Sequence, residues 1–137
     1  MVRLVIADDH KMVRDAWALL LRRDKRLLVS GLCENGEEVV DYCRKETPDI
    51  VLMDINMEPV NGIEATRAIR QFDNDVKIIG ISVHTDLPYI NALVSAGANG
   101  YVTKNSSGSE MIEAIFEVLE GRTYFCKEIV ALQNKIN

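Results

Sequence analysis

The chain has 137 residues, a formal net charge of −5 at pH 7, 47% hydrophobic residues and 27% charged residues. This length fits one compact domain with a hydrophobic core, and this composition excludes wholesale disorder. A negative net charge repels nucleic-acid phosphates, so DNA binding by this chain itself is disfavoured. In the first half of the chain the longest apolar run, residues 16–21, is too short to span a membrane.

Cysteine usage indicates the compartment. The three cysteines, Cys33, Cys43 and Cys126, form neither a C-x-x-C pair nor a metal-ligand spacing, so we expect buried neutral thiols. Because the sequence shows no disulfide pattern and no signal peptide, the expected location is the reducing cytoplasm, with no membrane partner.

Short apolar segments alternate with helical patterns along the chain. The segments are rich in Val, Ile and Leu and mostly unbroken, as in strands covered on both faces. They are residues 2–7, 27–33, 50–54, 77–82 and 100–103. Between them, apolar residues recur at helical spacing and form stripes. The first stripe contains Val13, Ala16, Trp17, Leu20 and Leu21, and the last contains Ile112, Ile115, Phe116 and Leu119.

Capping residues predict where these helices begin and end. Three segments place Asn or Ser three residues before Glu, an arrangement typical of a helix N-terminus, at Asn35, Asn61 and Ser107. Asp86 followed by Pro88 predicts a fourth start, and Gly97 and Gly121 are good helix stops. Repeated strand–helix units with right-handed crossovers predict an α/β fold, a doubly wound parallel sheet with helices on both faces. This domain covers residues 1–121, and residues 122–137 are a short extension or the start of a linker.

Polar residues occur where the predicted strands end. Asp8 and Asp9 follow the first strand, Asp54 ends the third, Ser82 ends the fourth and Lys104 follows the fifth. Each alone has an ordinary structural role, but ligands of open parallel sheets bind beyond these strand ends. Adjacent carboxylates repel each other unless a cation lies between them, and Mg²⁺ prefers oxygen ligands. The set therefore predicts a divalent-cation site with a lysine for an anion, the chemistry of a phosphoryl group held on a carboxylate.

Several longer motifs carry a resemblance to a known family. The chain resembles the receiver domain of bacterial two-component response regulators from Val2 to about Ala131. The resemblance implies a flavodoxin-like (βα)5 sheet with strand order 2-1-3-4-5. The matching motifs are residues 6–10, 48–54, 62–65, 81–82 and 96–104. Residues 9–10, 83–84 and 121–125 are similar to the subfamily that carries a C-terminal LuxR-type helix-turn-helix (NarL/FixJ-like).

The resemblance implies a role for each site residue. Asp54 is then the phosphorylated aspartate. Asp9, Asp54 and the backbone carbonyl of Asn56 are direct metal ligands, while Asp8 holds a metal-bound water. The cofactor is Mg²⁺, with Mn²⁺ as the alternative.

The remaining implied roles concern signalling. Lys104 and Ser82 contact the phosphoryl oxygens, and Tyr101 is the switch aromatic, which turns into space that Ser82 vacates. Asn56 and His84 tune dephosphorylation.

The implied function is a phosphoacceptor switch that assists its own phosphorylation and dephosphorylation and is not an enzyme. The phosphodonor is a sensor histidine kinase, and phosphorylation favours a homodimer. Transcription is the expected output, with DNA bound only through a domain outside this chain.

Two positions depart from the family pattern. Pro59 lies one place late in the loop after Asp54, and Lys104 is followed by Asn105 rather than by proline. We expect a different entry into the helix after residue 61 and a more mobile segment after Lys104.

Other functions fit less well. A haloacid-dehalogenase-type hydrolase needs an acid where this chain has Asn56, and a flavodoxin-like cofactor site needs a phosphate-binding loop where it has Asp8 and Asp9. A degenerate receiver that only docks proteins stays open, and failure to bind Mg²⁺ would favour it.

Overall fold

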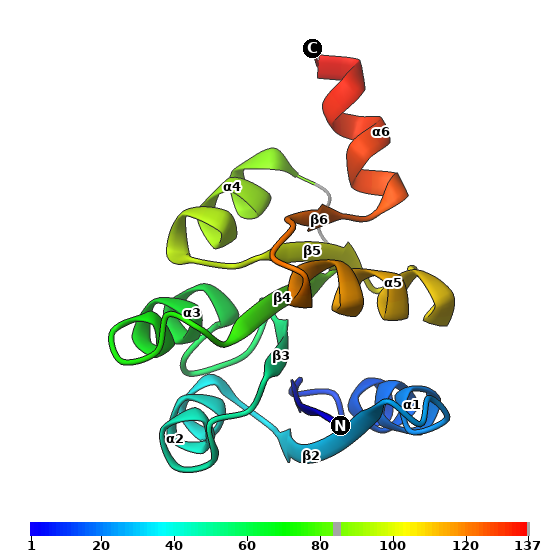
Figure 1. Cartoon of the computed structure of the whole chain (residues 1–137). Coiled ribbons are helices and arrows are strands. Elements are labelled where there is room, and N and C mark those ends of the chain that lie inside the picture. Colours follow the sequence, from blue (N-terminus) through cyan, green and yellow to red (C-terminus); the bar gives the residue numbers. More distant parts are fainter. Residues whose placement is uncertain (84–85, 137) are drawn as a thin grey trace.

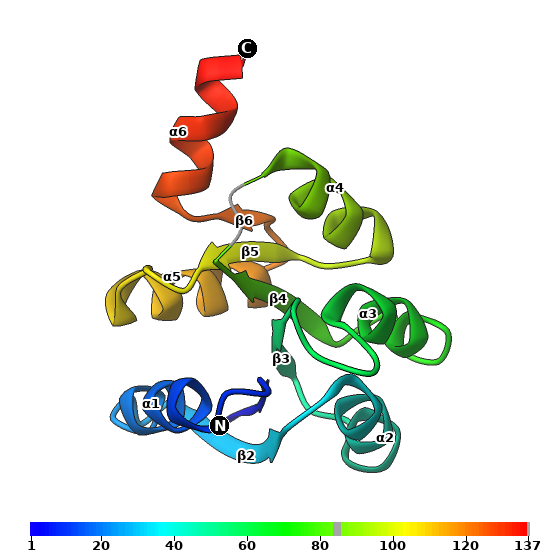
Figure 2. The ribbon, with the colours of Figure 1, turned by 180° about the vertical axis from the view of Figure 1, so that it is seen from behind.

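The computed structural model describes residues 1–83 and 86–136, which form a six-stranded parallel sheet flanked by helices (Figures 1 and 2). The strands are β1 (Val2–Ala7), β2 (Leu27–Cys33), β3 (Ile50–Asp54), β4 (Lys77–Ser82), β5 (Gly100–Thr103) and β6 (Tyr124–Phe125). The helices are α1 (Lys11–Leu21), α2 (Gly36–Glu46), α3 (Gly62–Arg70), α4 (Leu87–Ala96), α5 (Gly108–Leu119) and α6 (Lys127–Ile136).

The strand order is β2-β1-β3-β4-β5-β6, so the predicted α/β fold and the order 2-1-3-4-5 are confirmed, with β6 added at one edge. Helices α1 and α5 cover one face of the sheet, and α2, α3 and α4 cover the other (Figure 1). All five residues of β3 are buried, as expected for a strand covered on both faces. The apolar runs therefore predicted the strands because each central strand packs against two helical layers.

The predicted helix starts are confirmed, and side chains cap three of them. Asn35 accepts from the N–H of Glu38, Asn61 from that of Glu64, and Ser107 from that of Glu110, at 2.8–3.1 Å. Asp86 precedes α4 without a side-chain cap bond among the described residues, and a proline in the first turn takes its place in starting the helix.

The first helix is rotated relative to its predicted apolar stripe. Arg14, Trp17, Ala18 and Leu21 are its buried residues, whereas Ala16 is exposed. Arg14 belongs to the buried face because its guanidinium donates to a backbone carbonyl there. A hydrophobic pattern does not record such a polar partner.

Residues 124–129 pack against the sheet. The N–H of Tyr124 donates to the carbonyl of Asn99 at 3.1 Å, and that of Cys126 donates to the carbonyl of Tyr101 at 3.1 Å. Cys126 and Ile129 are fully buried, while α6 points away from the sheet (Figure 1). The extension therefore begins as part of the fold. None of the helices in the described residues is long and apolar enough to cross a membrane.

The loop between β3 and α3 holds the helix close to the end of the strand. The N–H of Gly62 donates to the carbonyl of Ile55 at 2.9 Å. A Cβ atom on Gly62 would lie 2.3 Å from the carbonyl oxygen of Asp54, so only glycine fits. The late Pro59 follows a cis peptide bond after Glu58, and α3 still begins at Gly62 with a complete capping box.

Candidate functional site

Side chains from the carboxyl ends of β1, β3, β4 and β5 converge at one edge of the sheet. Asp8, Asp54 and Ser82 are at most 1% exposed there, and the side chain of Lys104 is 16% exposed. Because parallel strands point the same way, the residues that follow them share one edge. The structure thus brings together the acids, the serine and the lysine that the strand-end pattern predicted.

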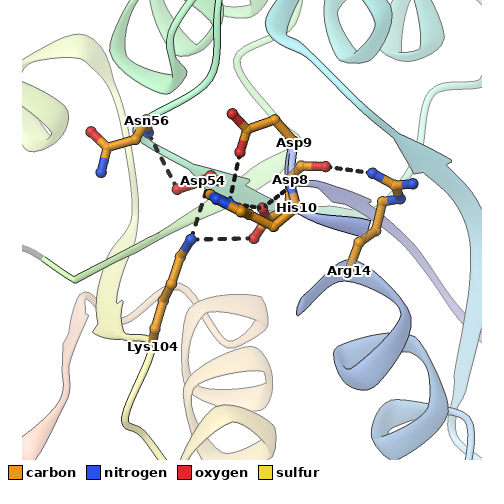
Figure 3. A network of polar contacts seen from close by, with 7 residues as sticks. All are labelled: Asp8, Asp9, His10, Arg14, Asp54, Asn56 and Lys104. Carbon is orange, nitrogen blue, oxygen red and sulfur yellow. Dashed lines mark hydrogen bonds and ion pairs between the residues drawn. The ribbon is translucent and has the colours of Figure 1, made fainter. Parts of the chain in front are cut away.

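Lys104 lies between two carboxylates. Its Nζ is 3.6 Å from Oδ2 of Asp54 and 3.7 Å from Oδ2 of Asp8 (Figure 3). Its backbone N–H donates to the carbonyl of Ser82 at 3.0 Å, which fixes the end of β5 beside the end of β4. The ammonium offsets the charge of both carboxylates at a distance beyond hydrogen-bonding range.

Asp54 carries the strongest electrostatic perturbation of the site. Its Oδ1 accepts from the N–H of Asn56 at 3.2 Å, while Oδ2 is buried without a hydrogen-bond partner among the described residues. Burial raises the pKa of Asp54 from 3.8 to about 6, and the charge of Asp8 adds to the shift, while Lys104 and the N–H of Asn56 oppose it. A buried carboxylate with an unpaired oxygen is stabilised by any cation that reaches it.

Three acids and one histidine form a group that could hold a metal ion. Ligand atoms of Asp8, Asp9, His10 and Asp54 all lie within 4.8 Å of one another. The N–H of His10 donates to Oδ1 of Asp8 at 2.8 Å, and Nδ1 of its ring is 3.0 Å from Oδ1 of Asp9. The three carboxylates belong to the metal set predicted with Asn56, whereas the sequence analysis assigned no role to His10. Its position directly after two acids at a strand end was the available signal.

Arg14 supports the turn that carries these acids. Its Nη1 donates to the backbone carbonyl of Asp8 at 2.7 Å (Figure 3). Its Nη2 is 3.8 Å from Oε1 of Glu34. The side chain is only 9% exposed. Sequence reasoning did not single out Arg14, although it lies three residues before Trp17 and hence on the same helix face.

Tyr101 is fully buried and packs beside Ser82. Burial raises the pKa of Tyr101 to about 12, and a hydrogen bond with Ser82 opposes the shift. Tyr101 pairs in register with Gly80, where a Cβ atom would lie 1.9 Å from Cδ2 of Leu93 and 3.5 Å from the tyrosine ring. The glycine makes room for Leu93, while 3.5 Å to the tyrosine ring is an ordinary contact distance. Since Tyr101 is fully buried, the ring already lies inside before any movement of Ser82. The sequence had led us to expect an inward turn only afterwards.

Of the two residues expected to tune dephosphorylation, Asn56 and His84, the structure describes only Asn56. Asn56 is exposed beside the site, and its side chain points away from Asp54 (Figure 3). It lines a groove of about 390 Å³ together with Glu58 and Tyr89. His84 lies outside the described residues.

Comparisons with known proteins agree with this geometry. Residues 4–116 match the model of the response regulator receiver domain family. The chain is 38% identical to the response regulator UvrY of Escherichia coli K12 over 129 residues, 94% of this chain and 59% of UvrY. It is also 38% identical to the transcriptional regulatory protein DegU of Brevibacillus brevis, over 90% of this chain and 52% of DegU.

A solved structure is similar along its whole length. The crystal structure of a LuxR-family two-component response regulator from Aurantimonas superposes with a TM-score of 0.93 at 33% identity, covering 100% of this chain and 99% of that one. The present chain spans only 59% and 52% of the two curated relatives. The fold, the strand-end acids with their lysine, and these matches together show that the chain belongs to the response regulator receiver domain family.

Proposed function

We propose that this domain is a phosphorylation switch in which Asp54 accepts a phosphoryl group from a sensor histidine kinase. The observation that carries the proposal is the buried Oδ2 of Asp54, which faces Lys104 at 3.6 Å and has no hydrogen-bond partner among the described residues. Burial is the main cause of the raised pKa of Asp54, and the ion pair with Lys104 offsets that effect only in part. Functional sites are where such perturbed groups gather.

The residues present fit a hard divalent cation. Carboxylate oxygens of Asp8, Asp9 and Asp54 lie close enough to share one ion, and such oxygens are the ligands that Mg²⁺ prefers. We infer that Asp9, Asp54 and the carbonyl of Asn56 hold Mg²⁺, or Mn²⁺ in its place. Asp8 already accepts the N–H of His10, so we assign it to a metal-bound water. When bound, the ion supplies positive charge that offsets the phosphoryl oxygens.

The reaction is an in-line transfer to oxygen. A carboxylate oxygen of Asp54 attacks phosphorus, a P–O bond forms, and the P–N bond to the histidine of the kinase breaks. The electron pair of that bond stays on the imidazole nitrogen, which then takes a proton from water. Lys104 stabilises the charge that develops on the phosphoryl oxygens, because its ammonium already lies beside Asp54.

Ser82 and Tyr101 are the residues that we propose to read the phosphoryl group. The hydroxyl of Ser82 would turn toward the new phosphoryl oxygens and give up its hydrogen bond with Tyr101. The ring, buried beside Gly80, would then repack between β4, β5 and α4. Phosphorylation in this way shifts a population between two packings of one face.

The output of this switch is proposed to be transcription. DegU, one of the similar proteins, is a transcriptional regulatory protein. The net charge of −5 disfavours DNA contact by these residues, which supports our proposal of a separate DNA-binding domain that phosphorylation releases or dimerises. The three cysteines are free and buried, which supports the cytoplasm as the place of action. We propose residues 1–121 as the receiver and 122–137 as the lead into that output domain.

Phosphorylation of Asp54 can be tested directly. The chain is incubated with Mg²⁺ and a small phosphodonor, trapped with borohydride and mapped by mass spectrometry. We expect a single adduct on Asp54, and none in Asp54→Asn or without Mg²⁺. Asp75→Asn is the matched control because Asp75 is an exposed aspartate of the loop before β4. An adduct on another residue, or full labelling of Asp54→Asn, would overturn the proposal.

A further inference from the structure

The imidazole of His10 lies against the acidic group of the proposed metal site. Its Nδ1 is 3.0 Å from Oδ1 of Asp9 and 3.5 Å from Oδ1 of Asp8. His10 directly follows the two acids and precedes α1, and its ring points toward Asp54 (Figure 3). A nitrogen ligand is therefore positioned among oxygen ligands.

The spacing of these atoms suits one ion. In an octahedral site with bonds of about 2.1 Å, neighbouring ligand atoms lie ~3.0 Å apart and opposite ones ~4.2 Å apart. The Nδ1 atom and the nearest carboxylate oxygen have the separation of neighbours. All four potential ligand atoms lie within 4.8 Å of one another, so small side-chain shifts bring them to a common centre.

A second observation points to a cation at this place. Oδ2 of Asp54 is fully buried and has no hydrogen-bond partner among the described residues. Lys104 is 3.6 Å from it, which is too long for a hydrogen bond. A buried carboxylate oxygen that lacks a hydrogen bond and faces other acids is the condition that a bound ion relieves.

We propose that His10 is a nitrogen ligand of this site, so that the site takes a borderline divalent transition-metal ion such as Co²⁺ with His10, Asp9 and Asp54. Imidazole nitrogen suits Co²⁺, Ni²⁺ and Zn²⁺, whereas Mg²⁺ prefers oxygen alone. The inference rests on the proposed metal site and adds selectivity to it. With Mg²⁺ the ring stays outside the ligand set, and with a transition metal it enters.

Replacing His10 by glutamine isolates the imidazole. The hydrogen bond between the backbone N–H of residue 10 and Asp8 does not involve the ring and is kept. The His10 side chain is 64% exposed, so its removal leaves the core intact. Titration calorimetry with Co²⁺ and with Mg²⁺, on the full chain, measures both affinities, and the visible spectrum of bound Co²⁺ reports nitrogen ligation.

We expect His10→Gln to lower the affinity for Co²⁺ about ten-fold or more and to change the Co²⁺ spectrum, while the affinity for Mg²⁺ is kept. Asp75→Asn is the control, because it removes an exposed potential ligand in the loop before β4, away from the site. Equal changes for both ions would mean that His10 does not act as a nitrogen ligand. An unchanged Co²⁺ affinity in His10→Gln, or a loss of Co²⁺ affinity in Asp75→Asn, would also overturn the assignment. Wild-type chain that binds no Mg²⁺ and takes no phosphate on Asp54 would instead refute the proposed function.

Discussion

The hydroxyl of Thr103 donates a hydrogen bond of 2.9 Å to Oε2 of Glu128, and so ties the last residue of β5 to the first turn of α6. Thr103 is 1% exposed and directly precedes Lys104. A second bond, from the N–H of Lys127 to Oε2 of Glu110, holds the same turn to α5. A shift of Lys104 toward a phosphoryl group would therefore reach α6 through one intervening side chain.

Thr103→Val removes this tie and keeps the shape of the side chain. We expect a loss of about 1–2 kcal/mol in the local stability of α6, because the carboxylate of Glu128, a charged acceptor, loses its hydroxyl donor. Hydrogen exchange of the amides of residues 127–136 should be faster, while those of β1 and β3 keep their protection. Thr123→Val, at an exposed threonine before β6, is the control. Equal exchange in both variants would show that the bond does not hold the helix.

The ionisation of Asp54 should limit stability above neutral pH. Burial and the charge of Asp8 raise its pKa in the folded state to about 6, against 3.8 for an ordinary aspartate. The neutral form is thus favoured by folding, so its stabilisation is complete below pH 3.8 and is lost as pH rises through about 6. Asp54→Asn cannot ionise, so above about pH 6 its free energy of unfolding does not suffer this loss, which is on the order of 2 kcal/mol or less.

Thermal unfolding of the metal-free chain from pH 4.5 to 8 checks the sign. The melting temperature of Asp54→Asn should exceed that of the wild type above about pH 6, with the difference shrinking toward pH 4.5. Mg²⁺ should narrow the difference at pH 8, because a cation stabilises the ionised carboxylate. A difference that stays constant across the pH range, or one that Asp75→Asn reproduces, would contradict the assignment.

Arg14→Met tests whether the buried guanidinium positions Asp8. The substitution keeps the apolar stem and leaves the carbonyl of Asp8 without its 2.7 Å partner, so we expect a loss of about 1–3 kcal/mol in the free energy of unfolding. Mg²⁺ affinity should fall about ten-fold, as for other groups that orient metal ligands. Arg23→Met, at an exposed arginine, is the control. Lower stability with unchanged Mg²⁺ affinity would restrict Arg14 to the fold.

Lys104→Ala and Ser82→Ala should separate phosphorylation from its conformational effect. Lys104 is the cation beside Asp54, so its loss should slow labelling of Asp54. Ser82→Ala should still take the phosphoryl group but respond weakly, because its contact with Tyr101 is gone. The fluorescence of Trp17, the only tryptophan, reports the change, since it shares a groove of about 270 Å³ with Lys104. A full fluorescence response in Ser82→Ala would rule out its role in the switch.

Much of the fold and of the acidic site was predictable because both follow from local patterns. Unbroken apolar runs such as residues 50–54 indicate strands covered on both faces, and residues after parallel strands must share an edge. The docking of α6 was not predictable. The strand before it, β6 (Tyr124–Phe125), is only two residues long and too short to show an alternating hydrophobic pattern. The hydrogen bond between Thr103 and Glu128 joins residues that are 25 positions apart.

The partners of polar side chains were equally hidden. From the sequence, Arg14 is expected on the surface, because hydropathy patterns record its charge and not the backbone carbonyl of Asp8 that accepts its hydrogen bond. Tyr101 lies deeper than expected: it is fully buried, beside Gly80 of the neighbouring strand and bonded to Ser82. Each of these depends on a tertiary contact, which spacing along the chain does not encode.

The lifetime of the phosphorylated state should depend on the side chain of Asn56. Its backbone N–H bonds to Oδ1 of Asp54 and is unaffected by substitution, so Asn56→Asp should still accept a phosphoryl group. A carboxylate two residues after the phosphoacceptor can take a proton from the attacking water, which should speed hydrolysis about ten-fold or more. The measurement is the decay of borohydride-trapped Asp54 adduct after removal of the phosphodonor. Asn74→Asp, at an exposed asparagine in the loop before β4, adds the same charge away from the site and should leave the decay unchanged. An unaltered lifetime in Asn56→Asp would exclude its side chain from the water path and leave that role to be tested at His84.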